Sequence, residues 1–399
     1  MKGYTATLPD GAATHYVDHK RWFWAASVLF PLQPFIGIAL HARTGNEFWL
    51  LLPFLLNYGL GPVIDWLLGE DRNSPPDAVI PKLERDTYYR RLTYIAVPMH
   101  FVTLFGVAWY AATQNLSWWA FLGLGAVAGL TAGLAINTGH ELGHKNSRFE
   151  KWLAKIVLAI PAYGHFTIDH NLGHHRKVST PEDPSSSRMG ESIYKFARRE
   201  MPGAFKEAWS IETDRLQRRN RSAWHPNNQI LQSYAITLLI TVALVAMFGW
   251  IMVPFLLLHH LLAWWGLTSA NYVEHYGLLR RKDADGKYER CQPHHSWNSN
   301  HIYSNVVLFH LQRHSDHHAN PLRRYQSLRH FDNLPELPNG YFGVYVLAYI
   351  PSLWFRVMDR RLLALPAVNH DLDRVNIDPD ARAGLFLKYG REKMLEPTL

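Results

Sequence analysis

Long apolar stretches alternate with polar segments along the chain, and this pattern predicts membrane-spanning helices. A helix needs about 20 apolar residues to cross a hydrocarbon core of about 30 Å. Helices in the core of a soluble protein are usually shorter and amphipathic, so we favour a membrane protein. Six segments are predicted to span the membrane: Trp22–Ala42, Phe48–Leu68, Leu92–Thr113, Trp118–Asn137, Ile230–Gly249 and Ile251–His275.

Lysine and arginine fall almost entirely on one side of these six segments. The connections after the first, third and fifth segments hold only Arg43, whereas Lys20 and Arg21 precede the first segment and basic stretches follow the second, fourth and sixth. By the positive-inside rule the basic side faces the cytoplasm, which predicts cytoplasmic termini and a cell inner membrane location. The net charge of +8 is then explained by topology and not by nucleic-acid binding.

The remaining polar segments are predicted to form a helical and loop-rich cap on the cytoplasmic side. The cap comprises residues of about 138–229 and 276–399, and together with the spans it makes one membrane-embedded catalytic domain, 1–399. Two shorter apolar stretches, Trp152–His165 and Tyr341–Val357, each contain a proline and are predicted to be interfacial or re-entrant helices. We therefore expect an all-α, polytopic membrane protein with six transmembrane helices.

Histidine is concentrated in four short motifs on the predicted cytoplasmic side. The chain has 23 histidines, and those spaced three or four residues apart share one face of a helix, so their imidazoles can converge. One ion with three or four protein ligands cannot use nine imidazoles, whereas two ions with four or five nitrogens each can. Imidazole suits iron, zinc and copper alike, and we favour iron because higher coordination numbers suit it better than structural zinc. The nine predicted metal ligands are His140, His144, His170, His174, His175, His275, His314, His317 and His318.

Six polar residues near these histidines are candidates for hydrogen bonds that orient the imidazoles. A metal-bound imidazole commonly donates its second N–H to a carboxylate or a carbonyl. For Asp169, Glu274 and Asp316 the alternative is an ordinary solvated or salt-bridged carboxylate. The six candidates are Glu141, Asp169, Asn271, Glu274, His301 and Asp316.

Two other classes of protein account for fewer of the histidines. The segment from His140 to His144 matches the HExxH pattern of zinc metalloproteases, with Glu141 as the base, but one zinc would leave the other seven histidines unexplained. A membrane metal carrier would have ionisable residues at mid-bilayer, where only His259 and His260 fit. The single cysteine, Cys291, excludes a disulfide framework and an iron–sulfur centre held by this chain alone.

Two histidine segments resemble those of the membrane-bound alkane monooxygenase family. They are Asn271–Leu278, with the sequence NYVEHYGL, and Leu311–Ala319, with LQRHSDHHA. The three histidine boxes are shared more widely with histidine-rich membrane di-iron enzymes, which include fatty acid desaturases and xylene monooxygenase. Lys82–Glu84 and Ser187–Ser192 extend the resemblance over nearly the whole chain. Asp169 departs from the family, which more often has the longer glutamate before that histidine.

The resemblance implies a chemistry, a cofactor and a set of partners. It implies a non-haem centre of two iron ions, O2 as co-substrate, and hydroxylation of medium-chain alkanes to primary alcohols in the presence of membrane lipid. It also implies electrons from rubredoxin, which a flavin-dependent rubredoxin reductase reduces in turn. Sibling reactions stay open as alternatives, namely desaturation or hydroxylation of a fatty acyl chain and oxidation of an alkylaromatic, xylene-type substrate.

Small residues on the fourth predicted span indicate a channel for such a substrate. Gly125, Gly129 and Gly133 recur every four residues, and His140 follows the last of them by seven, which returns to within about 20° of the same helix face. The stripe, with Asn137 beside it, predicts a groove that admits an alkyl chain end-on. Close packing against another helix is the alternative meaning of this spacing.

Overall fold

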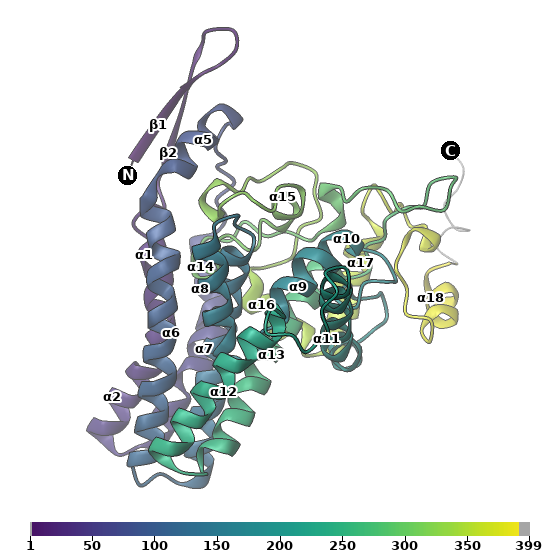
Figure 1. Cartoon of the computed structure of the whole chain (residues 1–399). Helices are drawn as coiled ribbons and strands as arrows, with labels where there is room; N and C mark the ends of the chain where they lie inside the picture. Colours follow the sequence, from purple (N-terminus) through teal and green to yellow (C-terminus); the bar gives the residue numbers. More distant parts are fainter. Residues whose placement is uncertain (1, 391–399) are drawn as a thin grey trace.

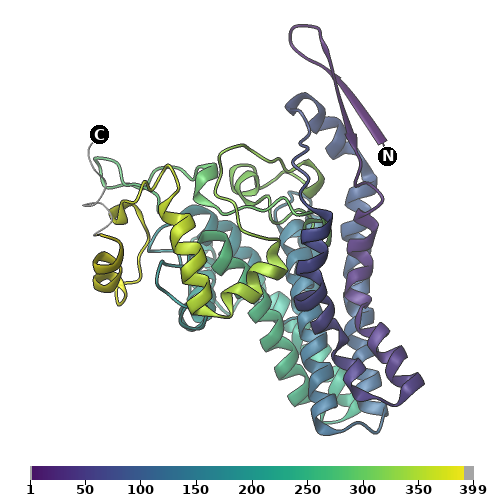
Figure 2. The same cartoon turned by 180° about the vertical axis from the view of Figure 1, so that it is seen from behind.

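The computed structural model describes residues 2–390, and this part of the chain is helical apart from one two-stranded sheet (Figures 1 and 2). A bundle of long helices carries a cap of shorter helices and loops at one end, where the sheet and α18 also lie (Figure 1). Strands β1 (Lys2–Thr7) and β2 (Ala13–Asp18) pair antiparallel. They form an arm that projects from the bundle.

Five helical segments are long and apolar enough to cross a membrane, and two bent helix pairs raise the possible number to seven. The chain is therefore a multi-pass membrane protein, as predicted, while the number of six spans stays a prediction. The five segments are Glu47–Leu68, which joins η2, α3, η3 and α4, then α6 (Thr87–Thr113), α7 (Trp118–Gly143), α12 (Gln229–Phe248) and α13 (Met252–His275).

The first predicted span is a bent pair and not one continuous helix. Helix α1 (Trp24–Leu29) and the short turn η1 (Phe30–Leu32) meet α2 (Pro34–Thr44) at an angle of 46°. Proline lacks a backbone N–H and its ring clashes with the preceding turn of a helix. Pro31 and Pro34 therefore interrupt the helix at this point.

Two spanning helices extend further than their apolar residues predict. Helix α6 begins at Thr87, five residues before the predicted start, because the side chain of Asp86 accepts a hydrogen bond from the backbone N–H of Tyr88 and caps the helix. Helix α7 continues beyond Asn137 to Gly143. Its last two turns thereby project from the apolar part of the bundle and carry the first histidines.

The glycine stripe of α7 lies mainly against α13. A side chain at Gly129 would meet the backbone of His259, and one at Gly125 would come within 3.1 Å of the carbonyl oxygen of Phe255. These two glycines permit close helix packing, so the predicted groove does not extend along them. Gly133 differs, because a side chain there would have no atom nearer than 3.8 Å.

The cap is built on the ends of α7 and α13. Helices α16 and α17 form the second bent pair, with an angle of 118°, so they make a corner. They occupy the second stretch that was predicted to be interfacial or re-entrant. The other stretch predicted to be interfacial corresponds to α8 and the turn after it. The cap elements are α8 (Arg148–Ala159), α9 (Phe166–Ile168), η5 (Asp169–His174), α10 (His175–Lys177), α11 (Ile193–Gln217), α14 (Ile302–Val307), α15 (His314–Ala319), α16 (Tyr341–Ala348), α17 (Pro351–Leu363) and α18 (Arg382–Tyr389).

Candidate metal centre

Eight of the nine predicted ligands form two clusters, and all eight are buried. Within each cluster one nitrogen of every imidazole lies within 4.8 Å of the others. The first cluster combines His140 of α7, His144 directly after that helix, His170 of η5 and His317 of α15. The second combines His174 of η5, His275 of α13, and His314 and His318 of α15.

The ninth histidine, His175, lies between the clusters on the side of the first. Its Nε2 atom is 3.1 Å from Nε2 of His170 and 3.2 Å from Nε2 of His317. Its ring centroid is also 4.4 Å from that of His318, which belongs to the second cluster. The nine imidazoles thus form one continuous group that divides into five and four.

Local backbone geometry decides which histidine joins which cluster. On α7 the pair His140 and His144 is spaced by one helical turn and serves one cluster. The segment η5 is instead a π-helical turn, which is wider than an α-helical turn. His170 and His174 therefore point to different clusters, whereas their spacing alone predicted that they would converge.

Burial favours the neutral, metal-binding form of eight of the nine imidazoles, all except His174. Burial lowers the pKa of His170, His314 and His317 well below the usual value for histidine, and the neighbouring imidazoles lower it further. Nitrogen lone pairs therefore face one another in a dry interior. His140 and His317, for example, bring their Nε2 atoms to 2.9 Å.

The arrangement fits a pair of metal ions. Among the residues that the structure describes, Nε2 of His144 and Nε2 of His174 are buried without a hydrogen-bond partner. Buried polar atoms without partners are costly and call for an explanation. A cation in each cluster would satisfy these atoms and remove the unfavourable contacts between lone pairs.

A carboxylate that the sequence analysis missed orients one of the ligands. Nδ1 of His174 lies 2.8 Å from Oδ2 of Asp183, which is 1% exposed. Asp183 also accepts hydrogen bonds from the hydroxyl of Ser186 and the backbone N–H of Ser185. Burial lowers the pKa of His174, but the attraction of Asp183 outweighs burial, and the net shift is upward. Asp183 stands nine residues from His174 in a turn, so no helical spacing marks it.

A carbonyl oxygen fixes one further ring of the second cluster, and a carboxylate lies beside the cluster-facing nitrogen of another. Nδ1 of His275 lies 3.1 Å from the backbone carbonyl oxygen of His295, which leaves Nε2 of His275 facing the cluster. Glu274 lies between a ligand and the cap: one carboxylate oxygen accepts a hydrogen bond from the hydroxyl of Tyr341, and the other is 3.3 Å from Nε2 of His314.

The other five residues predicted to orient ligands have different surroundings. Glu141 pairs with Lys145 at 3.1 Å, and the carboxylate of Asp316 is bonded to Arg323, Asn320 and the backbone of Arg329. Those contacts are with residues other than the imidazoles, as the salt-bridge alternative predicted for Asp316.

Asp169, Asn271 and His301 also differ from the prediction. One carboxylate oxygen of Asp169 is buried without a hydrogen-bond partner in the described chain, and burial raises the pKa of this carboxyl group. Asn271 donates to Glu200 of α11 at 3.0 Å. His301 contacts Ser299 at the edge of the cap.

A third, smaller group of possible ligands consists of Glu289, His294 and His295. Nδ1 of His295 accepts a hydrogen bond from the backbone N–H of Gln292, so Nε2 carries the proton. That nitrogen lies 3.5 Å from a carboxylate oxygen of Glu289. This group is satisfied without a metal, in contrast to the two clusters.

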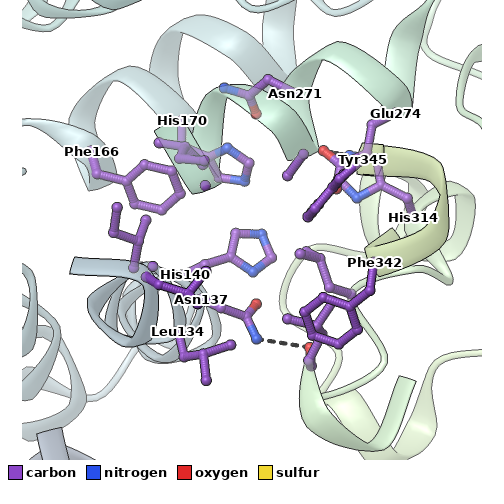
Figure 3. A pocket seen from close by; sticks show the side chains of 18 of the residues that line it. Leu134, Asn137, His140, Phe166, His170, Asn271, Glu274, His314, Phe342 and Tyr345 are labelled. Atoms are coloured by element: carbon purple, nitrogen blue, oxygen red, sulfur yellow. Dashed lines mark hydrogen bonds and ion pairs between the residues drawn. The ribbon is translucent and has the colours of Figure 1, made fainter. Parts of the chain in front are cut away.

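A narrow cavity of about 70 Å³ opens onto both clusters (Figure 3). His140 and His170 of the first cluster and His314 of the second line it, together with Glu274. Its remaining walls are mostly apolar and come mainly from α7, α9, α13, α16 and the loop before α15. They include Gly133, Leu134, Ile136, Phe166, Leu267, Ala270, Leu308, Leu311, Phe342 and Tyr345.

Two of the four predicted channel residues line this cavity, Gly133 and Asn137. Nδ2 of Asn137 donates a hydrogen bond of 2.8 Å to the carbonyl oxygen of Leu308, the dashed contact in Figure 3. The Nδ2 donor of this amide thereby has a hydrogen-bond partner at the edge of an apolar cavity. Gly125 and Gly129 lie against α13 and are absent from the cavity walls, which corrects the prediction for these two.

Known proteins resemble the chain over nearly its full length. A family model described as fatty acid desaturase matches residues 116–349. Alkane 1-monooxygenase 1 of Alcanivorax borkumensis is 52% identical over 94% of this chain and 92% of its own length. The chain belongs to the alkane 1-monooxygenase family. Two other members, the alkane 1-monooxygenases of Pseudomonas putida and Ectopseudomonas oleovorans, are 52% and 53% identical over 98% and 95% of this chain, and over 96% and 94% of their own lengths. The predicted resemblance is confirmed.

Proposed function

We propose that the protein hydroxylates medium-chain alkanes at the terminal carbon, with O2 as co-substrate and two histidine-bound iron ions as the cofactor. The observation that carries the proposal is the meeting of two buried four-histidine clusters with one apolar cavity. An alkane offers no polar group, so its recognition needs apolar walls and its oxidation needs a redox-active metal. The cavity supplies the apolar walls, and the clusters beside it offer the ligands for the metal.

The nine histidines are the proposed ligands, with five nitrogens available to one ion and four to the other. When bound, the metal pair supplies the oxidising power that breaks an unactivated C–H bond. The side chains of the protein contribute position and dryness. Asp183 and the carbonyl of His295 orient two imidazoles, Glu274 stands at the boundary between ligands and cavity, and the apolar walls exclude water from the reacting carbon.

Electrons must come from another protein. Cys291 is the single cysteine, so the chain has no C-x-x-C pair that could hold an iron–sulfur centre. We propose rubredoxin as the donor, reduced upstream by rubredoxin reductase, which is the donor system that the family resemblance implies.

We further propose that the chain lies in the cell inner membrane as one catalytic domain with a cytoplasmic cap and cytoplasmic termini. The distribution of Lys and Arg along the sequence supports this orientation. A donor protein dissolved in the cytoplasm would then reach the cap directly.

The experiment that tests the function uses the full chain in lipid nanodiscs with iron, rubredoxin, its reductase and NADH. Octane is the substrate, and parallel reactions contain a fatty acyl substrate or xylene. We expect octane to give 1-octanol in an O2-dependent reaction that outpaces the other two. Preferential oxidation of xylene or of the acyl chain would refute the alkane proposal in favour of a sibling reaction.

A further inference from the structure

A second pocket lies on the exposed face of α17 and shares no lining residue with the cavity beside the histidines. Its volume is about 580 Å³. Ser352, Arg356 and Arg360 are spaced by four residues, so they stand in a row along α17 and line the pocket together. Lys388 of α18 and His370, from the loop between the two helices, complete its polar wall.

The charge of this pocket is one-sided. Arg356, Arg360 and Lys388 carry full positive charges, and the lining includes no carboxylate. Within residues 2–390, none of these three side chains forms an ion pair within 4.0 Å. Like charges one helical turn apart repel each other, so an anion bound between the two arginines would stabilise the pair on α17.

The carboxylate behind the pocket does not supply that anion. Asp359 lies on the buried face of α17, is 1% exposed, and accepts hydrogen bonds from the hydroxyls of Tyr276 and Tyr389. It attracts Lys388 from within the protein, but it is closed off from the space that the two arginines face.

A larger basic groove beside α11 makes the contrast clear. Its volume is about 690 Å³, and its basic residues are accompanied by Glu182, Glu207 and Asp214. Lys177 is paired with Glu207 at 2.6 Å. That groove is partly neutralised by its own carboxylates, whereas the described residues that line the pocket on α17 include none.

The surroundings of the α17 pocket are apolar. Phe355 and Leu363 form part of its wall. The corner between α16 and α17 exposes Ile350 and Leu353, which are 49% and 39% exposed, and α18 exposes Leu387. In Figure 2 this corner lies beside the bundle of spanning helices, between the two yellow-green helices. An apolar tip followed along the helix by arginines is typical of a segment that rests at a membrane interface.

We propose that the α17 pocket binds the phosphate-bearing headgroup of an anionic phospholipid. Two guanidinium groups on one face can each form paired hydrogen bonds with phosphate oxygens, and the hydroxyl of Ser352 can add another. Phe355, which is partly exposed, contacts the start of the acyl chains, while Leu363 supports the pocket wall from the core. A zwitterionic headgroup would bring its own cation into a pocket lined by basic groups, so an anionic lipid is favoured.

The test measures lipid binding to the detergent-solubilised full chain by native mass spectrometry. The probes are short-chain phosphatidylglycerol, phosphatidylcholine with the same acyl chains, and inorganic phosphate. We expect phosphatidylglycerol to bind at least tenfold more tightly than either other probe. The double variant Arg356→Gln/Arg360→Gln should lose at least tenfold in that affinity.

The matched control is Arg218→Gln/Arg219→Gln, which removes two exposed arginines just beyond α11 and should bind phosphatidylglycerol like the parent. If the pocket variant does not fold, Lys388→Gln replaces it, with an expected loss of about threefold. Unchanged binding in the pocket variant, or an equal loss in the control, overturns the proposal. Equal affinity for phosphatidylcholine overturns the preference for an anionic headgroup. Inorganic phosphate that binds as tightly as phosphatidylglycerol would assign the pocket to a free anion, against the lipid.

Discussion

Replacing Asp183 by asparagine tests how strongly a buried carboxylate supports the second histidine cluster. Asp183→Asn keeps the shape, but its single carbonyl oxygen can replace only one of the two carboxylate oxygens, the one 2.8 Å from Nδ1 of His174 or the one that accepts from the backbone of Ser185 at 3.0 Å. It removes the negative charge from a site that is 1% exposed. Removing such a partner of a metal-bound histidine typically weakens metal binding by about 10- to 100-fold, which corresponds to about 1.4–2.7 kcal/mol. We expect a loss in this range for one of two metal ions.

The assay is metal retention by the purified protein during dialysis against graded concentrations of a chelator. Asp316→Asn is the control, because Asp316 is next to His317 in the sequence and equally buried, but its carboxylate is bonded to Arg323. That variant should lose thermal stability and keep the metal affinity of the parent. If Asp183→Asn holds both ions as tightly as the parent, or if the two variants weaken binding equally, the assigned role of Asp183 is wrong.

Three further predictions follow from the cavity, from a buried carboxyl group and from the metals. Gly133→Leu should shift the product profile toward alcohols of shorter alkanes, because its side chain enters the cavity without meeting the backbone, and gas chromatography measures that profile. Gly129→Ala should instead lower the melting temperature, measured by thermal melts, because its side chain meets α13. An unchanged product profile for Gly133→Leu would contradict the cavity assignment. Burial raises the pKa of Glu200 from 4.5 to about 7, so its protonated form stabilises the fold at low pH, and that stabilisation is lost as the pH rises from 4.5 through 7. Glu200→Gln should therefore gain stability relative to the parent over this window, by about 3 kcal/mol in total, and a difference in unfolding free energy that does not change with pH would refute this. Removal of metal by a chelator should abolish octane oxidation, and ferrous iron should restore it; recovery with zinc alone would be incompatible with a redox role.

Much of the architecture could be predicted because the bilayer imposes simple rules. A span must be apolar for about 20 residues, and that requirement alone located all five long segments. It could not locate the bend at Pro31 and Pro34, or the extension of α7 beyond the apolar region, because those features depend on individual prolines and on packing in the cap. The N-terminal hairpin was not predicted either, since its short polar strands carry little periodic signal.

The histidines could be predicted as a set, but their division into clusters could not. Spacing of three or four residues does not decide the division, because His170 and His174 lie on a π-helical turn. His314 and His317, three residues apart on the α-helix α15, also belong to different clusters. Asp183 was missed because its contact with His174 is made by a turn in the folded chain. The glycine stripe could indicate a substrate groove or close helix packing. At Gly129 the backbone of α13 lies too near for a groove, so the glycine serves helix packing there.

The central claim is that nine imidazoles hold two redox-active metal ions beside an apolar cavity. The most direct test of this arrangement is the metal content per chain of the active protein. Elemental mass spectrometry measures it across preparations that differ in activity. Octane oxidation should rise with iron content and reach its maximum at two iron ions per chain. Full activity with one metal ion per chain, or with zinc in place of iron, would contradict it.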